Sequence, residues 1–254
     1  REVFLRLLLV TTFPNSAWDA YAREALASLR RFLPAEVRVG VALDDDALKS
    51  QVAGLLAAGD ELITGWQPDH REFVMRYAAR DHRQEYRLQA TRFSHKIFFL
   101  HQFFQQAKSS AGHLIWWDAD AVLKRRVSLE ELAAVLPGKE EAVSYLGRKD
   151  WDHSECGFMA FNMQHAGATA ILNFMHYYYT TGMVFSLPQW HDSYLFDVAR
   201  AGQPCRNLSE GVPGNNVWAA TALGAYSEHR KGLEAKRLGR ALNDAELYGE
   251  ARNA

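Results

Sequence analysis

Cysteine is scarce in this sequence, which has only two among 254 residues, Cys156 and Cys205. Two cysteines are too few for the disulfide framework of a small secreted domain, and their spacing is not that of a zinc knuckle. We therefore expect reduced thiols and a cytoplasmic protein. The first residue is Arg1 rather than Met, which leaves open whether a targeting segment precedes it.

Long apolar runs and an excess of one charge are also missing. No apolar run approaches the about 20 residues that a membrane-spanning helix needs. The formal net charge is −1, so the chain has no general attraction for nucleic acid or for anionic membranes. The chain is nevertheless long enough, and with 48% hydrophobic residues apolar enough, to bury a sizeable core.

Glycine is absent from the turn after the first predicted strand, which covers residues 5–13 and leads into Pro14-Asn15-Ser16. A glycine-rich loop at this place binds phosphates in many nucleotide-binding enzymes. Its absence counts against a sugar nucleotidyltransferase, which is the first of two alternative functions.

The chain opens with a strand, a helix and a second strand. Apolar residues recur at helical spacing over 16–32, and the strand predicted over 37–43 ends in Asp44-Asp45-Asp46. This order implies a parallel sheet with helices on its faces. Further helices are expected at 48–58, 93–107, 129–136, 166–180 and 192–201, a charged helical segment at 68–92, and strands at 113–117, 142–146 and 158–162. The predicted fold is α/β, a mostly parallel sheet flanked by helices, in one domain spanning 1–254.

Two carboxylates interrupt the apolar stretch LIWWDADAVLKRRV, residues 114–127. Asp118 and Asp120 come directly after the strand predicted at 113–117. Ligands of open α/β sheets bind beyond the carboxyl ends of the strands, and buried carboxylates need a partner. Two carboxylates one residue apart can share one hard cation such as Mn²⁺ or Mg²⁺. A solvated turn or a helix N-cap is the alternative for such a pair.

A basic stretch near the C-terminus offers a third ligand. His229-Arg230-Lys231-Gly232 is followed by Lys236. Imidazole is a good ligand for Mn²⁺, and lysines neutralise phosphate oxygens. We predict that this stretch closes a metal site over a diphosphate, the alternative being a solvated basic tail. Because 228–237 lacks apolar periodicity, we expect little packing to hold it without ligand.

These motifs together resemble those of a GT-A glycosyltransferase. The resemblance is carried by Val10-Thr11-Thr12, Asp44-Asp45, Asp118-Ala119-Asp120 and His229-Arg230-Lys231-Gly232. Their order and spacing are similar to glycosyltransferase family eight, the group of glycogenin and related galactosyltransferases. In that family the DxD pair and a distant His ligate Mn²⁺, which holds a UDP-sugar. The Lys-Pro-Trp that usually follows the His-x-x-Gly stretch in that family is absent here.

The resemblance implies a role for several residues of this chain. Residues 1–125 would bind the nucleotide, and 126–254 the sugar and the acceptor. Asp118, Asp120 and His229 would be the metal ligands. The nucleoside would contact Thr11, Thr12, Phe13 and either Asp44 or Asp45, and the β-phosphate would contact Lys231 and Lys236.

Three further charged residues could face the reacting groups. Lys96, beside an aromatic helix, needs a phosphate or a DxD carboxylate as partner, unless it extends to solvent. Glu155 would bind sugar hydroxyls or only form a strand-entry turn. Asp192 would cap its helix or face the anomeric carbon of the donor. We predict that the catalytic carboxylate is Asp192 or Glu155.

The expected activity is metal-dependent transfer of a sugar from a nucleotide-sugar, UDP-linked by resemblance, to an acceptor hydroxyl. An inverting enzyme would use one of the two carboxylates as general base. A retaining enzyme, which the family-eight resemblance favours, would use Asp192 to stabilise the cationic sugar. The acceptor is a glycan, a lipid-linked sugar, a protein or a modified DNA base. A non-catalytic carbohydrate-binding domain is the second alternative.

Overall fold

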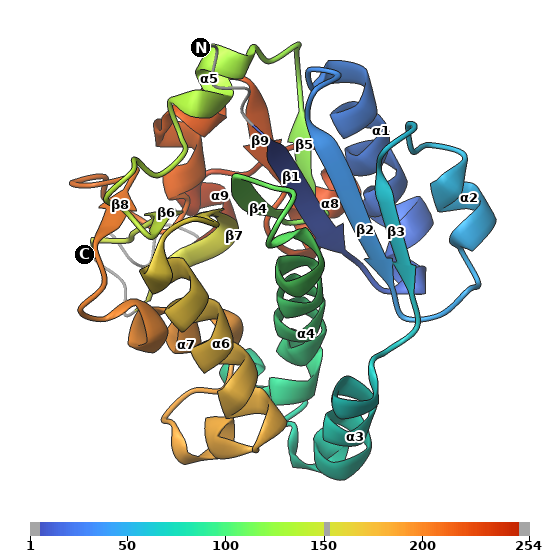
Figure 1. Cartoon of the computed structure of the whole chain (residues 1–254), viewed down its shortest axis with the longest axis vertical. Helices are drawn as coiled ribbons and strands as arrows, with labels where there is room; N and C mark the ends of the chain where they lie inside the picture. Colours follow the sequence, from blue (N-terminus) through green and yellow to red (C-terminus); the bar gives the residue numbers. More distant parts are fainter. Residues whose placement is uncertain (1–5, 150–152, 249–254) are drawn as a thin grey trace.

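The computed structural model describes residues 6–149 and 153–248. Its centre is a seven-stranded sheet in the order β3-β2-β1-β4-β7-β6-β8 (Figure 1). The strands are β1 (Leu7–Thr12), β2 (Arg38–Leu43), β3 (Glu61–Thr64), β4 (His113–Trp117), β6 (Val143–Leu146), β7 (Glu155–Asn162) and β8 (Cys205–Asn207). Strand β7 is antiparallel to both of its neighbours, and every other neighbouring pair is parallel. The predicted α/β fold class is confirmed.

Helices cover both faces of this sheet (Figure 1). The α-helices of the described residues are α1 (Arg23–Phe32), α2 (Lys49–Ala53), α3 (Pro68–Tyr77), α4 (Ala90–Ala107), α5 (Leu129–Ala133), α6 (Ala166–Thr180), α7 (Asp192–Arg200), α8 (Gly232–Leu238) and α9 (Asp244–Tyr248). A separate antiparallel ribbon pairs β5 (Ala121–Leu123) with β9 (Ser227–His229).

The alternation of side chains along the central strands builds two cores. Leu8 and Val10 of β1 pack into the apolar cluster that contains the buried face of α4. Leu7 and Leu9 pack into the cluster that contains α1. Successive side chains of a strand point to opposite faces, so a strand that is apolar at every position is buried on both sides. The apolar run at the start of the chain therefore becomes a central strand.

Several predicted boundaries were wrong. The strand expected over 5–13 covers Leu7–Thr12, and residue 5 lies outside the described residues. The helix expected over 16–32 begins with a 3₁₀ turn and a π-helical turn. The segment 68–92 is not one continuous helix: α3 ends at Tyr77, two 3₁₀ turns follow, and α4 begins at Ala90. The carboxylate of Asp81 accepts a hydrogen bond from the backbone N of Thr91 and so stabilises the start of α4. The short strands β3, β8 and β9 and the helix α8 were not predicted from the sequence.

The predicted functional residues lie at the edge of the sheet where the carboxyl ends of the parallel strands meet. Strands β1, β2 and β4 run parallel, so their carboxyl ends lie at the same edge. Strand β7 runs the opposite way, and Phe158 pairs with Trp117 at the end of β4. The beginning of β7 therefore lies beside the end of β4, which is where Asp118 and Asp120 follow.

No helix within the described ranges combines the length and apolar character needed to cross a membrane.

Gly40 of β2 lies directly under the ring of Phe103 from α4. A Cβ atom added at Gly40 would come within 2.6 Å of Phe103 Cε1 and 3.0 Å of Val10 Cγ1. Because Phe103 is fully buried and cannot move aside, we expect Gly40→Ala to lower the free energy of unfolding by about 1–3 kcal/mol. Urea unfolding measures this change. The matched control is Gly54→Ala at the exposed end of α2, where the added Cβ meets its neighbours only at 3.5 Å. Equal stability of the two variants would contradict this packing.

Candidate active site

The turn after β4 holds the two aspartates of the DxD motif. The backbone N of Ala121 donates to the carbonyl of Asp118 at 2.9 Å, which closes the turn. The backbone N of Asp118 donates to the carbonyl of Gly157 at 2.9 Å, and its carboxylate accepts a bond from Trp116 Nε1 at 2.6 Å. The position of Asp118 is therefore set by strands β4 and β7 together.

His229 reaches the aspartates through the β5–β9 ribbon. Ala121 pairs with His229 in this ribbon, and the backbone N of Arg230 donates to the carbonyl of Asp120 at 3.0 Å. Arg230 also binds Glu24 at 2.6 and 2.8 Å. The expectation that little packing holds 228–237 was wrong for 228–230, because backbone pairing and a bidentate ion pair supply contacts that apolar periodicity does not reveal, whereas 232–234 are exposed.

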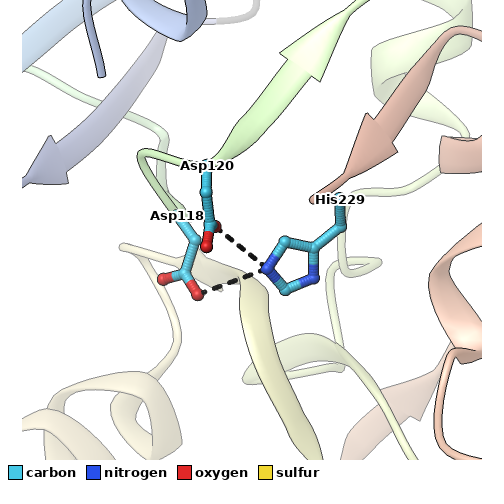
Figure 2. Close-up of side chains that lie close together, drawn as sticks. All are labelled: Asp118, Asp120 and His229. Atoms are coloured by element: carbon cyan, nitrogen blue, oxygen red, sulfur yellow. Dashed lines mark ion pairs between the residues drawn. The ribbon is translucent and has the colours of Figure 1, made fainter. Parts of the chain in front are cut away.

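Asp118, Asp120 and His229 converge on one point (Figure 2). Nε2 of His229 lies 3.0 Å from Asp120 Oδ1 and 3.8 Å from Asp118 Oδ2. One ligand atom from each residue lies within 4.8 Å of the other two. Asp120 Oδ1 is buried, and its polar neighbour among the described residues is Nε2 of His229. Two carboxylates and an imidazole that face one another fit a divalent cation such as Mn²⁺.

Two lysines lie against these carboxylates from other helices. Nζ of Lys96 in α4 lies 3.3 Å from Asp118 and 2.8 Å from Asp192 Oδ2, and it also contacts the carbonyl of Cys156. Nζ of Lys236 in α8 lies 2.7 Å from Asp120. Lys96 does not extend to solvent, because its side chain is only 10% exposed. It connects the DxD motif to the carboxylate at the start of α7.

The electrostatics of the cluster depend on burial and on these cations. Burial and the charge of Asp120 raise the pKa of Asp118, although Lys96 opposes the shift. Burial would also raise the pKa of Asp120, but His229 and Lys236 outweigh it and lower that pKa. Burial lowers the pKa of His229, and Asp120 more than reverses this shift. A proton on His229 thus occupies the place of a cation, and a bound metal would displace it.

Glu155, at the start of β7, is surrounded by cations. Its Oε2 contacts Arg148 and lies 2.7 Å from Lys231 Nζ, while its Oε1 accepts from the backbone N of Gly157 at 3.1 Å. The Oε1 atom also lies 4.0 Å from His229 Nδ1. Burial opposes ionisation, but Lys231 and Arg148 hold the pKa of Glu155 well below its usual range. Arg148 was not predicted from the sequence, because a single arginine in a loop belongs to no recognisable motif.

A first cavity of about 380 Å³ opens beside the DxD motif. Of the residues predicted to contact the donor, it is lined by Thr12, Phe13, Asp44, Lys96 and Lys236. Trp66 Nε1 and His95 Nδ1 hold the carboxylate of Asp44 at 2.9 and 3.2 Å, and neither partner was predicted.

Two of the residues predicted to contact the nucleoside do not line this cavity. Thr11 is buried, and its side chain points away from that of Thr12 because successive strand residues alternate. The carboxylate of Asp45 accepts bonds from Asn15 Nδ2 at 3.0 Å and from the backbone N of Ala47 at 2.8 Å. The structure therefore brings Asp44, rather than Asp45, to the cavity.

A second cavity of about 560 Å³ adjoins the first. Its lining includes both DxD aspartates and Asp192, which also line the first cavity. Glu155, His229 and Lys231 line only the second. Asp192 is the first residue of α7 and not its cap, because the side chain of His191 accepts from the backbone N of Tyr194 there. The DxD motif and Asp192 therefore lie where the two cavities meet.

The fold is similar to those of glycosyltransferases of known structure. Mouse xyloside xylosyltransferase 1 in its apo form matches with a TM-score of 0.52 and 15% identity, over 80% of this chain and 85% of that chain. The glycosyltransferase GlyE of Streptococcus pneumoniae matches in two structures with TM-scores of 0.50 and 14% identity, over 79 and 80% of this chain. The matches span 44 and 45% of the GlyE chains, which is less than half of their length.

Comparison of the sequence with protein families and with curated proteins gives no match. At 14 or 15% identity the structural likeness concerns the fold, which is the α/β fold of these glycosyltransferases. The specific resemblance to family eight stays a prediction.

Gly157 makes room for the imidazole of His229. A Cβ atom there would lie 2.8 Å from His229 Cε1 and 3.2 Å from Nδ1. We expect Gly157→Ala to displace the ring and to weaken Mn²⁺ binding about tenfold, as the loss of an orienting neighbour does at other metal sites. Calorimetric titration with Mn²⁺ measures this effect. The control is Gly112→Ala, where the added Cβ meets its nearest atom, Arg6 O, at 3.6 Å. Unchanged Mn²⁺ affinity in Gly157→Ala would remove His229 from the ligand set.

Proposed function

We propose that this protein is a metal-dependent glycosyltransferase that transfers a sugar from a UDP-sugar to an acceptor hydroxyl. The observation that carries the proposal is the convergence of Asp118, Asp120 and His229 at the junction of two cavities. The likeness of the fold to glycosyltransferases supports it.

Asp118, Asp120 and His229 would hold a divalent cation, Mn²⁺ or Mg²⁺. Such an ion, when bound, acts as a Lewis acid that stabilises the negative charge of a leaving diphosphate. Lys236 already lies against Asp120 and would turn from it to phosphate oxygens. Lys231, which binds Glu155 and lines the second cavity, is a second cation that would face the diphosphate. Positive charge already present in the site lowers the cost of stabilising the leaving group.

The first cavity would bind the nucleoside. Phe13 offers a ring, and the carboxylate of Asp44 is held in place by Trp66 and His95. A fixed carboxylate can accept the N–H of a uracil ring, which supports a uridine donor. Thr12 remains a candidate for contacts with the donor, whereas Thr11 and Asp45 would contribute only through the backbone.

Asp192 is the better candidate for the catalytic carboxylate. It lines both cavities, and Lys96 holds it ionised at 2.8 Å. A carboxylate paired with a buried lysine is a poor proton acceptor but can stabilise a cationic sugar. This arrangement favours retention, in which the leaving diphosphate guides the proton of the acceptor. Glu155 lies between Lys231 and Arg148 and near His229 Nδ1, so we propose that it positions His229.

The second cavity would receive the transferred sugar and the acceptor hydroxyl. Asp192 lines both cavities and Asp44 lines only the first, so the second cavity would lie on the far side of the diphosphate from the nucleoside. The acceptor would be a glycan, a lipid-linked sugar, a protein or a modified base. Once the donor sugar is known, testing each of these classes with it identifies the acceptor.

Asp120→Asn tests the metal site with an isosteric change. We expect it to reduce Mn²⁺-dependent UDP binding and UDP-sugar hydrolysis by about 100-fold or more, because loss of a ligand exceeds the effect of losing an outer neighbour. The control is Asp19→Asn, an exposed residue that lines neither cavity. UDP binding is read from the rise in melting temperature, and hydrolysis from released UDP. Wild-type hydrolysis by Asp120→Asn would overturn the metal assignment.

Removal of the metal tests the choice of ion. We expect EDTA to abolish UDP-sugar hydrolysis and Mn²⁺ to restore it better than Ca²⁺. Two carboxylates and one imidazole suit Mn²⁺, whereas Ca²⁺ prefers a larger number of oxygen ligands. A panel of UDP-glucose, UDP-galactose and UDP-xylose identifies the donor in the same assay. Full activity in excess EDTA would contradict a metal-dependent reaction.

The same assay separates the two alternatives. A sugar nucleotidyltransferase would release pyrophosphate from UTP and a sugar 1-phosphate and would not hydrolyse the UDP-sugar. A non-catalytic binding domain would be stabilised by its ligand without releasing UDP.

A further inference from the structure

His153 has two unused ring nitrogens in the second cavity. The residue lines this cavity and is only 6% exposed. Neither Nδ1 nor Nε2 makes a hydrogen bond of normal geometry to any residue that the structure describes, and the ring has only a weak backbone interaction with Ser154. A buried polar group without a partner costs free energy, so a native protein usually pairs it with water or a ligand. These nitrogens point to a bound group that His153 recognises.

The neighbours of His153 have different roles. The ring of His191 lies edge-on to it at 4.5 Å. Both nitrogens of His191 are engaged, Nε2 with Gln189 Oε1 at 2.7 Å and Nδ1 with the backbone N of Tyr194 at 3.4 Å. His191 therefore supports the start of α7 and the ring of His153, whereas His153 remains available to a ligand.

Arg148 presents a further unused donor to the same cavity. Its guanidinium binds Glu155, and its side chain is 5% exposed. Its Nε is nevertheless buried and bonds to no group in the described part of the chain. The cavity therefore contains one imidazole and one N–H group that lack partners, on two residues that follow β6 in sequence.

The imidazole of His153 is neutral near pH 7. Burial and the positive charge of Arg148 both lower its pKa from its ordinary value. A neutral imidazole carries one N–H donor and one nitrogen acceptor. A hydroxyl group can donate a hydrogen bond to the acceptor nitrogen or accept one from the N–H group. A carboxylate or an ionised phosphate can only accept. A cationic group is disfavoured by the adjacent arginine.

We propose that His153, together with Arg148 Nε, binds a sugar hydroxyl in the second cavity and so determines sugar specificity. This inference rests on the proposed function, because that function gives the second cavity its sugar. The hydroxyl belongs either to the transferred sugar or to the acceptor. Both sources have the same chemistry, and the experiment distinguishes them.

His153→Phe keeps a ring of similar size against His191 and removes both nitrogens, and His153→Asn restores a donor and an acceptor. The control is His82→Phe, an exposed histidine that lines neither cavity. The first readout is calorimetric affinity for UDP and for each UDP-sugar of the panel, with Mn²⁺. The second is the affinity of methyl glucoside, methyl galactoside and methyl xyloside for the complex with UDP and Mn²⁺.

We expect His153→Phe to leave UDP affinity unchanged and to weaken one sugar ligand about tenfold, with partial recovery in His153→Asn. Weakened UDP-sugar affinity assigns the hydroxyl to the donor, and weakened glycoside affinity assigns it to the acceptor. If His153→Phe does not fold, His153→Asn together with a deoxy-sugar ligand provides the same comparison.

Equal loss of UDP and UDP-sugar affinity, or no loss for any sugar, overturns the inference. It is also overturned if wild-type protein binds UDP but gains nothing from any of the sugars. Failure of the wild-type protein to bind UDP with Mn²⁺ is a different result, since it contradicts the proposed function itself.

Discussion

The structure of the site depends on one constraint, the gathering of four carboxylates at one edge of the sheet, of which Glu155 and Asp192 are buried and Asp118 and Asp120 are partly buried. Asp118, Asp120, Glu155 and Asp192 lie within adjoining cavities, and each is paired with a cation from another element. An unpaired buried carboxylate would be too costly to keep. The pairs link α4 and α8 to the turn after β4, α4 to the start of α7, and β7 to the start of α8. Under the proposed function the same charges would bind a metal and a diphosphate, so one set of contacts would serve both stability and function.

The topology makes this concentration of charge feasible. Parallel strands β1, β2 and β4 end at one edge, and the antiparallel β7 begins there. The β5–β9 ribbon then brings a residue from near the C-terminus beside the DxD turn. Each element contributes one or two side chains from a fixed backbone position. Rigid strands position reacting groups more accurately than loops do, which catalysis by preorganised charge requires.

Lys96 links the two parts of the site. Its ammonium contacts both Asp118 and Asp192, and so joins the turn after β4 to the start of α7. A change of charge at this turn would therefore be felt by Asp192 through one buried cation. The two cavities differ in the same way: Asp44 and Phe13 line only the first cavity, and His153 and Arg148 line only the second.

The sequence by itself determined the α/β fold class, because strand and helix periods alternate and Leu7–Val10 is apolar on both faces. It also singled out Asp118, Asp120 and His229, because a carboxylate pair after a buried strand and a histidine among lysines are local patterns. Only the tertiary structure decided which side chains meet. Arg148, His153, His95 and the choice of Asp44 over Asp45 depend on strand direction, side-chain alternation and loop paths, which place residues far apart in the chain in one cavity. Pairing of β5 with β9 is a backbone contact across about 100 residues, so no local pattern records it.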